Sequence, residues 1–257
     1  MLEEYKPLKG IDNVYLVHCD QCQFLHFFCN HTLVKLEINP NGYIPKTGLL
    51  FKNIINSDFY NKEVLDLGCG YLGILSVISN CYAPKRIDSI DIDYDVVKWF
   101  QYLIQKNNFS NICCFQSDYF ENVTGIYDII LSNPPQMPML KEMIHDSGGV
   151  DGRKYIIKIL RESYDYLRVG GKLYILIFDF LGINQKTNDE STIIDLALKS
   201  GYCAANIVYQ TEKKIKKESV TYCNLDHIKD VYPKYHFYNH AYQVCIVEFV
   251  KGDERNG

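Results

Sequence analysis

Short apolar runs alternate with amphipathic segments from residue 46 to the end of the chain. The runs "EVLDL", "YDIIL" and "LYILIF" are too short for buried helices, and between such runs lie segments like "DVVKWFQYLIQKNN" with apolar residues at helical spacing. Apolar strands that alternate with amphipathic helices form a mostly parallel sheet covered on both faces. The sequence therefore predicts an α/β fold with a doubly wound sheet, whose ligands bind beyond the carboxyl ends of the strands.

The first part of the chain follows a different pattern. Residues 1–45 read as short strands and turns and end in "NPNGYIPKTG". We therefore predict a strand-rich N-terminal extension over residues 1–45, followed by one α/β domain over residues 46–257.

Composition limits the class of protein. The chain is 47% hydrophobic and 23% charged, which is typical of a globular protein, and its formal net charge of −4 argues against binding nucleic acid through bulk electrostatics. The start "MLEEYKPLKG" lacks the pattern of a secretory signal, and the run at 173–178 is too short to cross a bilayer. We expect a cytoplasmic protein without a membrane partner; the oligomeric state is left open.

Ten cysteines are scattered along the chain, and one group of possible metal ligands is denser than the rest. It consists of Cys19, Cys22, His26, Cys29 and His31. A zinc site would need a second ligand pair at a longer spacing, whereas the residues between these are aromatic and alternate as in paired strands. We favour strand thiols over a metal site and predict no metal.

Polar or glycine residues follow four successive predicted strands. "LDLGCGYLG" places Asp66, Gly68 and Gly70 after the first strand, where glycines allow a tight turn and a close approach of backbone to ligand. Asp91 ends the next strand, where an acid commonly accepts hydrogen bonds from a ribose. Asp118 ends the third beside Tyr119, a pair suited to an exocyclic amine and an aromatic base. Each feature alone fits an ordinary turn, but four in register favour a ligand site.

The fourth strand ends in "SNPPQMP", residues 132–138. Neither proline nitrogen can donate to a sheet ladder, so the strand must stop there and the turn is rigid. Asn133 and the carbonyl of Pro134 place two hydrogen-bond acceptors at this turn.

These motifs resemble the class I S-adenosylmethionine-dependent methyltransferases, and within them the amino-methylating branch with an Asn-Pro-Pro-aromatic motif. "YIPKTG", "SDYF" and "LSNPPQ" are most similar to segments of the release-factor glutamine methyltransferases. The resemblance covers about residues 43–180 and implies a seven-stranded sheet with an antiparallel last strand. It further implies that S-adenosylmethionine is the cofactor and that its methyl group passes to an amide or amine nitrogen.

The resemblance also implies the roles of individual residues. Asp66, Gly68 and Gly70 would line the methionine part of the cofactor, Asp91 would hold the ribose, and Asp118 with Tyr119 would hold the adenine. The full set of predicted site residues is Asn133 and Pro134 for catalysis, Asp66, Gly68, Gly70, Asp91, Ile92, Asp118, Tyr119 and Asn133 for the cofactor, and Pro135, Gln136 and Tyr43 for the acceptor.

The acceptor is less constrained. Gln136 replaces the aromatic residue that would stack on a flipped base, so the sequence argues against nucleic acid and narrowly favours a small molecule over a protein. An adenine N6-methyltransferase of nucleic acid and a non-catalytic cofactor-binding subunit remain alternatives. An NAD-dependent dehydrogenase would use the glycine loop and the acid, but it has no use for the two prolines.

Two further segments are interpreted as structural. The lysines of "KKIKKES", residues 213–219, are expected to lie in a solvated loop, and His145 is expected to be a loop residue. The aromatic run from Tyr232 to Tyr242 is compatible both with hairpin packing and with a wall over the acceptor.

Overall fold

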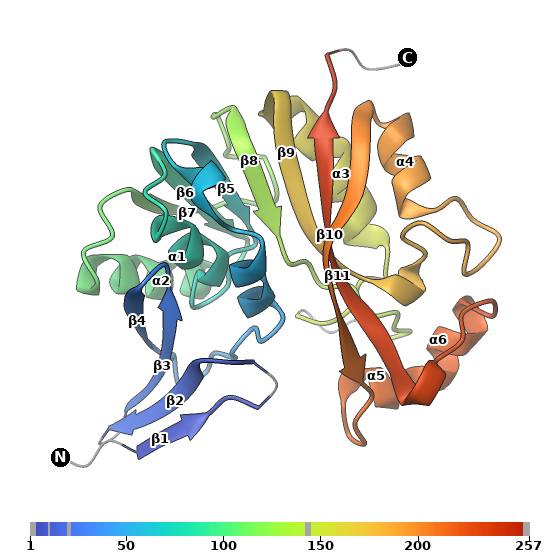
Figure 1. Cartoon of the computed structure of the whole chain (residues 1–257), viewed down its shortest axis with the longest axis horizontal. Coiled ribbons are helices and arrows are strands. Elements are labelled where there is room, and N and C mark those ends of the chain that lie inside the picture. The colour runs from blue at the N-terminus through green and yellow to red at the C-terminus, as the bar shows by residue number, and fades with distance from the viewer. Residues whose placement is uncertain (1–3, 10, 20–21, 142–144, 254–257) are drawn as a thin grey trace. The chain divides into compact units, whose positions relative to one another are not determined.

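The computed structural model describes residues 4–9, 11–19, 22–141 and 145–253. The chain divides into two compact units, residues 1–131 and residues 132–257, and each is described by itself. Figure 1 labels the elements of both units. The predicted boundary after residue 45 stays a prediction.

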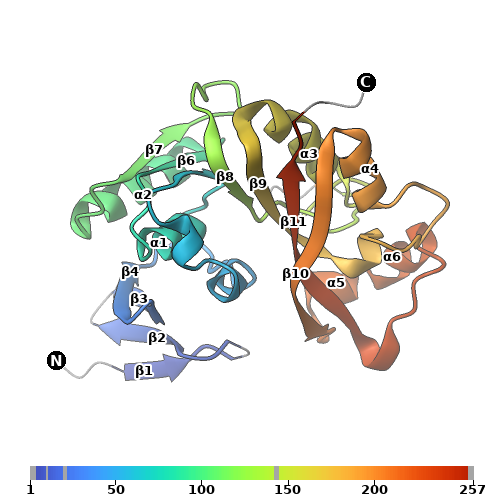
Figure 2. The ribbon, with the colours of Figure 1, turned by 45° about the horizontal axis from the view of Figure 1, so that its top comes forward.

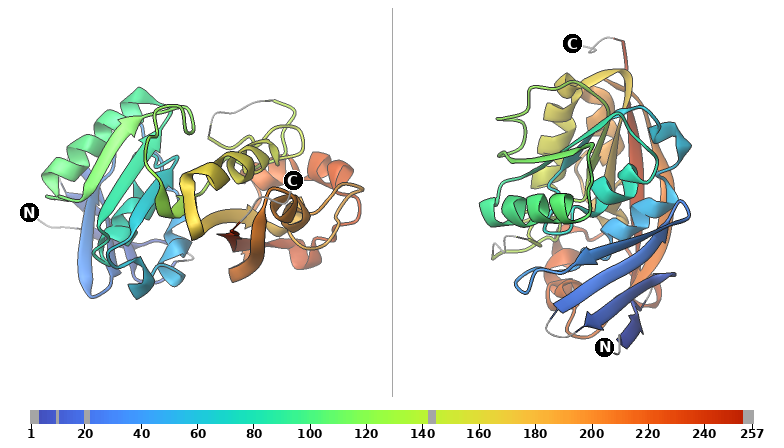
Figure 3. Two further views of the ribbon diagram at one scale, coloured as in Figure 1. Left: turned by 90° about the horizontal axis from the view of Figure 1, so that it is seen from above. Right: turned by 90° about the vertical axis from the view of Figure 1, so that its left-hand side faces the viewer.

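A four-stranded antiparallel sheet opens the first unit, as the strand pattern predicted. Its strands are β1 (Glu4–Pro7), β2 (Val14–Cys19), β3 (Cys22–Cys29) and β4 (Thr32–Glu37), paired in that order. Figure 3 shows these strands in blue, side by side. The turn from β3 to β4 is tight because Asn30 and His31 both adopt positive φ angles, 44° and 61°. Asn30 also donates from Nδ2 to the Cys81 carbonyl at 2.7 Å, and this bond links the turn to the residue that follows helix α1 (Ile74–Asn80).

Seven further strands confirm the predicted α/β fold. They are β5 (Glu63–Leu67), β6 (Arg86–Asp91), β7 (Ile112–Gln116), β8 (Tyr127–Ser132), β9 (Leu167–Phe178), β10 (Tyr202–Lys214) and β11 (Ala241–Lys251). Their order in the sheet is β10-β11-β9-β8-β5-β6-β7. The pairs β5–β6 and β6–β7 are parallel, and β11 is antiparallel to both β9 and β10. The antiparallel last strand therefore confirms what the family resemblance implied.

The helices of the first unit follow from local sequence signals. They are η1 (Gly48–Asn53), η2 (Ser57–Phe59), α1 (Ile74–Asn80) and α2 (Tyr94–Lys106). The Asp93 side chain caps α2 by accepting from the backbone N–H groups of Asp95 and Val96. The buried residues of α2 are Val96, Val97, Phe100 and Leu103, which recur at helical spacing along one face.

The second unit contains the remaining helices. They are α3 (Lys154–Tyr166), η3 (Asp179–Leu181), α4 (Ile193–Lys199), α5 (Val220–Cys223), α6 (Leu225–Val231) and η4 (Tyr238–His240). A capping box of Thr192 and Asp195 begins α4. Figure 2 shows α5 and α6 in the connection between the long strands β10 and β11.

Two segments with a helical residue pattern owe their details to the structure. The segment "GLLFKNIINS" is helical as its pattern indicates, and the helix is the 3-10 helix η1. The helical pattern of "RKYIIKILRESYDYLRVGG" continues to the glycines, but α3 ends at Tyr166 because Leu167 is already extended, with φ −95° and ψ 144°. The two glycines, Gly170 and Gly171, therefore lie within β9 instead of closing the helix.

Within the described ranges, which exclude short gaps at residues 10, 20–21 and 142–144 and both chain ends, no helix is long and apolar enough to cross a membrane.

Candidate active site

The glycine loop after β5 has the conformation that its sequence requires. The N–H groups of Gly68 and Cys69 both donate to the Ile90 carbonyl at 2.9 Å, so the loop turns across the end of β6. Gly68 and Gly70 have φ angles of 81° and 64°, a region that side chains disfavour. A Cβ atom added at either glycine would meet nothing within 4 Å. Open space above a bare backbone is what a closely bound ligand needs.

Asp66 lies beneath this loop. Its side chain is buried, with the residue 1% exposed, and Oδ2 accepts from the backbone N–H and the hydroxyl of Ser76 at 3.0 and 2.7 Å. Ser76 Oγ also shares a hydrogen bond of 2.6 Å with Ser89 on β6. Burial raises the pKa of Asp66 to about 7, against the lowering effect of the Ser76 hydrogen bonds. Asp66 therefore anchors the first turn of α1 under the loop; the predicted cofactor contact stays a prediction.

Asp91 ties the glycine loop to the end of β6. Its Oδ2 accepts from the Gly70 N–H at 2.9 Å, and its Oδ1 accepts from the Asp93 N–H at 3.1 Å. A carboxylate oxygen can accept more than one hydrogen bond, so this geometry is compatible with a hydroxyl donor from a ligand. Ile92, the next residue, is 60% exposed, as a residue that packs against a bound ring would be.

The end of β7 joins the same edge. The Ser117 N–H donates to the Asp91 carbonyl at 3.0 Å, and this bond joins the end of β7 to the end of β6. Asp118 is half-buried, and Tyr119 adopts a positive φ of 50°, so the chain turns sharply there. Within the first unit, the structure thus brings Asp66, Gly68, Gly70, Asp91, Ile92, Asp118 and Tyr119 to the ends of three adjacent strands.

The Asn-Pro-Pro turn belongs to the second unit. Asn133 and Pro135 are half-buried, and Pro134 is buried. Gln136 is 3% exposed, and its side-chain amide bonds to β9: Nε2 donates to the Leu176 carbonyl and Oε1 accepts from the Phe178 N–H, both at 2.8 Å. Nε2 also donates to the Pro134 carbonyl at 3.3 Å. Both N–H groups of the Gln136 amide therefore bond within the protein. These bonds do not support the prediction that this amide contacts the methyl acceptor.

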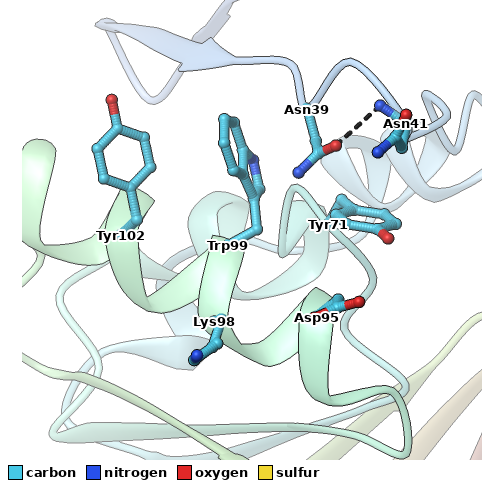
Figure 4. Close-up of a pocket in the computed structure, with 7 residues that line it drawn as sticks. All are labelled: Asn39, Asn41, Tyr71, Asp95, Lys98, Trp99 and Tyr102. Carbon is cyan, nitrogen blue, oxygen red and sulfur yellow. Dashed lines mark hydrogen bonds between the residues drawn. The ribbon is translucent and has the colours of Figure 1, made fainter.

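Tyr43, predicted from the "YIPKTG" resemblance, is not among the residues that line a surface pocket of the first unit. Tyr43 is 47% exposed. The pocket, of about 290 Å³, is lined by Asn39, Asn41, Tyr71, Asp95, Lys98, Trp99 and Tyr102. Figure 4 shows the rings of Tyr71, Trp99 and Tyr102 together with Asn39 and Asn41 from the segment after β4. Tyr71 directly follows Gly70, but none of the predicted site residues lines this pocket.

An aromatic cluster surrounds the end of β9. The Phe180 ring lies within 6.2 Å, centroid to centroid, of the rings of Tyr232, Tyr235, Phe237 and Tyr242. Asp179 accepts from the Tyr235 hydroxyl and from the Gln243 N–H at 2.8 and 2.9 Å, and burial raises the pKa of its carboxyl. These contacts support the hairpin-packing interpretation of the aromatic run. No local pattern pointed to Asp179, because its partners lie more than 50 residues away along the chain.

Two of the other interpretations can be compared with the structure. Lys213 is on β10 rather than in a loop, and its Nζ lies 5.6 and 5.8 Å from the ring centroids of Phe178 and Tyr242. Cys19 and Cys22 face each other where β2 meets β3. Among the residues that the structure describes, no group of three or more His, Cys, Asp or Glu side chains could hold a metal ion.

Comparison with known proteins places the chain in a family. A family model described as "Methyltransferase small domain" matches residues 45–216. The chain is 37% identical over 164 residues to a putative protein N5-glutamine methyltransferase of Methanocaldococcus jannaschii, an alignment that covers 60% of this chain and 81% of that protein.

More distant relatives act on different acceptors. The chain is 26% identical to a release factor glutamine methyltransferase of Francisella tularensis, over 55% of this chain and 56% of that protein. It is 32% identical to a ribosomal RNA small subunit methyltransferase C of Enterobacter, over 46% of this chain and 32% of that protein. A crystal structure of a methyltransferase from Pyrococcus furiosus shares the fold, with a TM-score of 0.52, 18% identity, and coverage of 84% of this chain and 88% of that one.

The chain belongs to the methyltransferase small domain family. Its class is that of the S-adenosylmethionine-dependent methyltransferases, and the predicted likeness to glutamine methyltransferases is confirmed. Because a relative is named for ribosomal RNA, the prediction that the acceptor is not a nucleic acid stays a prediction.

Proposed function

We propose that this protein methylates the nitrogen of a planar amide, and that the amide is a glutamine side chain of a protein. The observation that carries the proposal is the Asn133-Pro134-Pro135 turn, which directly follows strand β8. The similarity to a putative protein N5-glutamine methyltransferase supports a protein amide over the small molecule that the sequence narrowly favoured.

An amide nitrogen needs help to react because its lone pair is delocalised into the carbonyl group. In the proposed arrangement, the Asn133 side-chain oxygen accepts one N–H of the acceptor and the Pro134 carbonyl accepts the other. These two contacts direct the lone pair and stabilise the positive charge that develops on nitrogen. The carbonyl of Pro134 has two lone pairs, so its 3.3 Å contact with Gln136 leaves one for the acceptor.

The residues of the first unit fit the cofactor that the class requires. S-adenosylmethionine supplies a methyl group on a positively charged sulfur, which needs no further activation. We propose that the open backbone at Gly68 and Gly70 takes the methionine part, that Asp91 accepts from the ribose hydroxyls, and that Ile92, Asp118 and Tyr119 hold the adenine. Tyr43 is retained as a candidate acceptor contact on the family resemblance alone.

The test is methyl transfer from labelled S-adenosylmethionine to release factors, ribosomal proteins, total RNA, and small amides and amines. We expect label on a protein glutamine, located by mass spectrometry of peptides. Label on RNA would replace the amide proposal by a nucleobase amine, and label confined to small amides would exclude a protein acceptor.

The variant Asn133→Ala tests the clamp itself. Loss of one preorganised contact to developing charge should lower kcat by about 100-fold or more, while the Kd of the cofactor stays within about threefold. Asn111→Ala is the matched control, because Asn111 is likewise a half-buried asparagine, bonded through Nδ2 to the Pro84 carbonyl, and is not a predicted site residue. If Asn133→Ala loses cofactor binding together with activity, Asn133 acts on the cofactor or on the fold rather than on the acceptor, and the clamp is wrong.

A further inference from the structure

The side chain of Gln136 bonds to β9 in the way that a neighbouring strand would. It donates to the carbonyl of Leu176 and accepts from the N–H of Phe178, two residues further along β9. In a parallel ladder, one residue of a strand makes this same pair of bonds to residues i and i+2 of its neighbour. Pro134 and Pro135 have no backbone N–H to offer, so the side chain of Gln136 makes the bonds that this part of the chain cannot make from its backbone.

The backbone of Gln136 is held from the other side by the loop that precedes α3. A Cβ atom at Gly148 would lie 2.6 Å from the Gln136 Cα, and one at Gly152 would lie 2.5 Å from the Gln136 carbonyl oxygen. Such distances leave no room for any residue larger than glycine at either position. Met137, the next residue, donates to the Asp146 carbonyl at 2.8 Å and accepts from the Gly148 N–H at 2.9 Å. Gln136 is therefore fixed through both its backbone and its side chain.

The same amide reaches back to the turn. The second N–H of Nε2 donates to the Pro134 carbonyl at 3.3 Å, the carbonyl that the proposed function assigns to the acceptor nitrogen. One planar group thus connects the Pro134 carbonyl to two backbone groups of β9. Because Gln136 is only 3% exposed, water does not compete for these hydrogen bonds.

We propose that Gln136 is a positioning residue for methyl transfer, which fastens the Asn133–Pro135 turn to the end of β9 and orients the Pro134 carbonyl. The proposal rests on the proposed function, in which that carbonyl contacts the acceptor. An aromatic residue at this position could not make the three bonds, because a ring has no acceptor and donor pair that matches a peptide group.

The test compares Gln136→Met with Gln101→Met. Methionine keeps the length and volume of glutamine but removes its hydrogen bonds. Gln101 is the control, because its Nε2 also donates to a backbone carbonyl, that of Cys114 at 2.8 Å, on the other unit. We expect Gln136→Met to lower kcat by about 10- to 100-fold at a cofactor Kd within about twofold of wild type, since small misplacements of an orienting group are costly. Gln101→Met should change neither.

Hydrogen exchange gives a readout that does not depend on activity. In Gln136→Met, the Phe178 amide should exchange at least about tenfold faster than in wild type, because its acceptor is gone. Gln101→Met should leave that amide unchanged. If the wild-type protein methylates none of the acceptors, the proposed function fails, and the exchange rates alone then show whether Gln136 fastens the turn.

Two results would overturn the inference. One is a folded Gln136→Met protein whose kcat equals that of Gln101→Met. The other is an unchanged exchange rate at Phe178, which would mean that the turn is held without the glutamine. If Gln136→Met does not fold, Gln136→Leu, which also lacks the amide, is measured in its place by the same two readouts.

Discussion

Substitution of Gly70 by alanine tests whether the open space above the glycine loop belongs to the cofactor. Gly70 has a φ of 64°, and an added Cβ atom would meet nothing within 4 Å in the protein. The substitution therefore costs only the strain of a left-handed alanine, about 1–2 kcal/mol of folding free energy, with no clash. The Gly70 N–H that donates to Asp91 is retained.

The cost to cofactor binding is separate from this strain. A methyl group in a space that the ligand fills overpacks the site, which typically costs about 1–3 kcal/mol. We therefore expect the Kd of S-adenosylmethionine to rise about 5- to 150-fold. Isothermal titration calorimetry measures the affinity, and urea denaturation of the ligand-free protein measures the strain.

Gly170 supplies the matched control for this experiment. Its φ is 73°, an added Cβ there also meets nothing within 4 Å, and it lies near the start of β9, in the second unit, and is not a predicted site residue. Gly170→Ala should lose a similar folding free energy and bind the cofactor as wild type does. Wild-type affinity in Gly70→Ala, or an equal loss of affinity in Gly170→Ala, would refute the assignment of the glycine loop.

Two further predictions concern the acids of the first unit. Burial raises the pKa of Asp66 from 3.8 to about 7, so the folded protein keeps a proton that the unfolded chain loses, and the stability from this group falls as pH rises through that window. Between pH 5 and pH 7 the loss is about 2 kcal/mol, and Asp66→Asn should abolish it in urea denaturation curves; equal pH dependence in both proteins would contradict the reasoning. Asp91→Ala should weaken cofactor binding by about 1–3 kcal/mol, measured by calorimetry, while the exposed Asp95→Ala should not; unchanged affinity in Asp91→Ala would exclude the ribose contact.

Much of the fold could be predicted because it depends on short-range patterns. The period of apolar residues distinguishes strands from helices, and the sign of φ at a glycine follows from the turn that it must make. The positions of Asp91 and Asp118 followed from the same reasoning, since residues that end parallel strands meet at one edge of the sheet. The N-terminal strands were also predicted from alternation.

The errors in secondary structure were at element ends. The helix before β9 stops at Tyr166 although its pattern continues to the glycines, because Leu167 begins a strand that pairs with residues near the end of the chain. Such pairing depends on a partner strand about 80 residues away, so a short stretch of sequence around Leu167 does not reveal it.

The sequence alone determined which residues follow the ends of the parallel strands, because strand period and glycine conformation are local properties. Only the tertiary structure decided the hydrogen-bond partners of two polar side chains near these strand ends. Asp66 is bound beneath the loop by Ser76, and Gln136 bonds to β9 at Leu176 and Phe178, 40 and 42 residues further along the chain. A buried amide or carboxylate must find hydrogen-bond partners, and those partners are supplied by whichever strand the fold brings alongside.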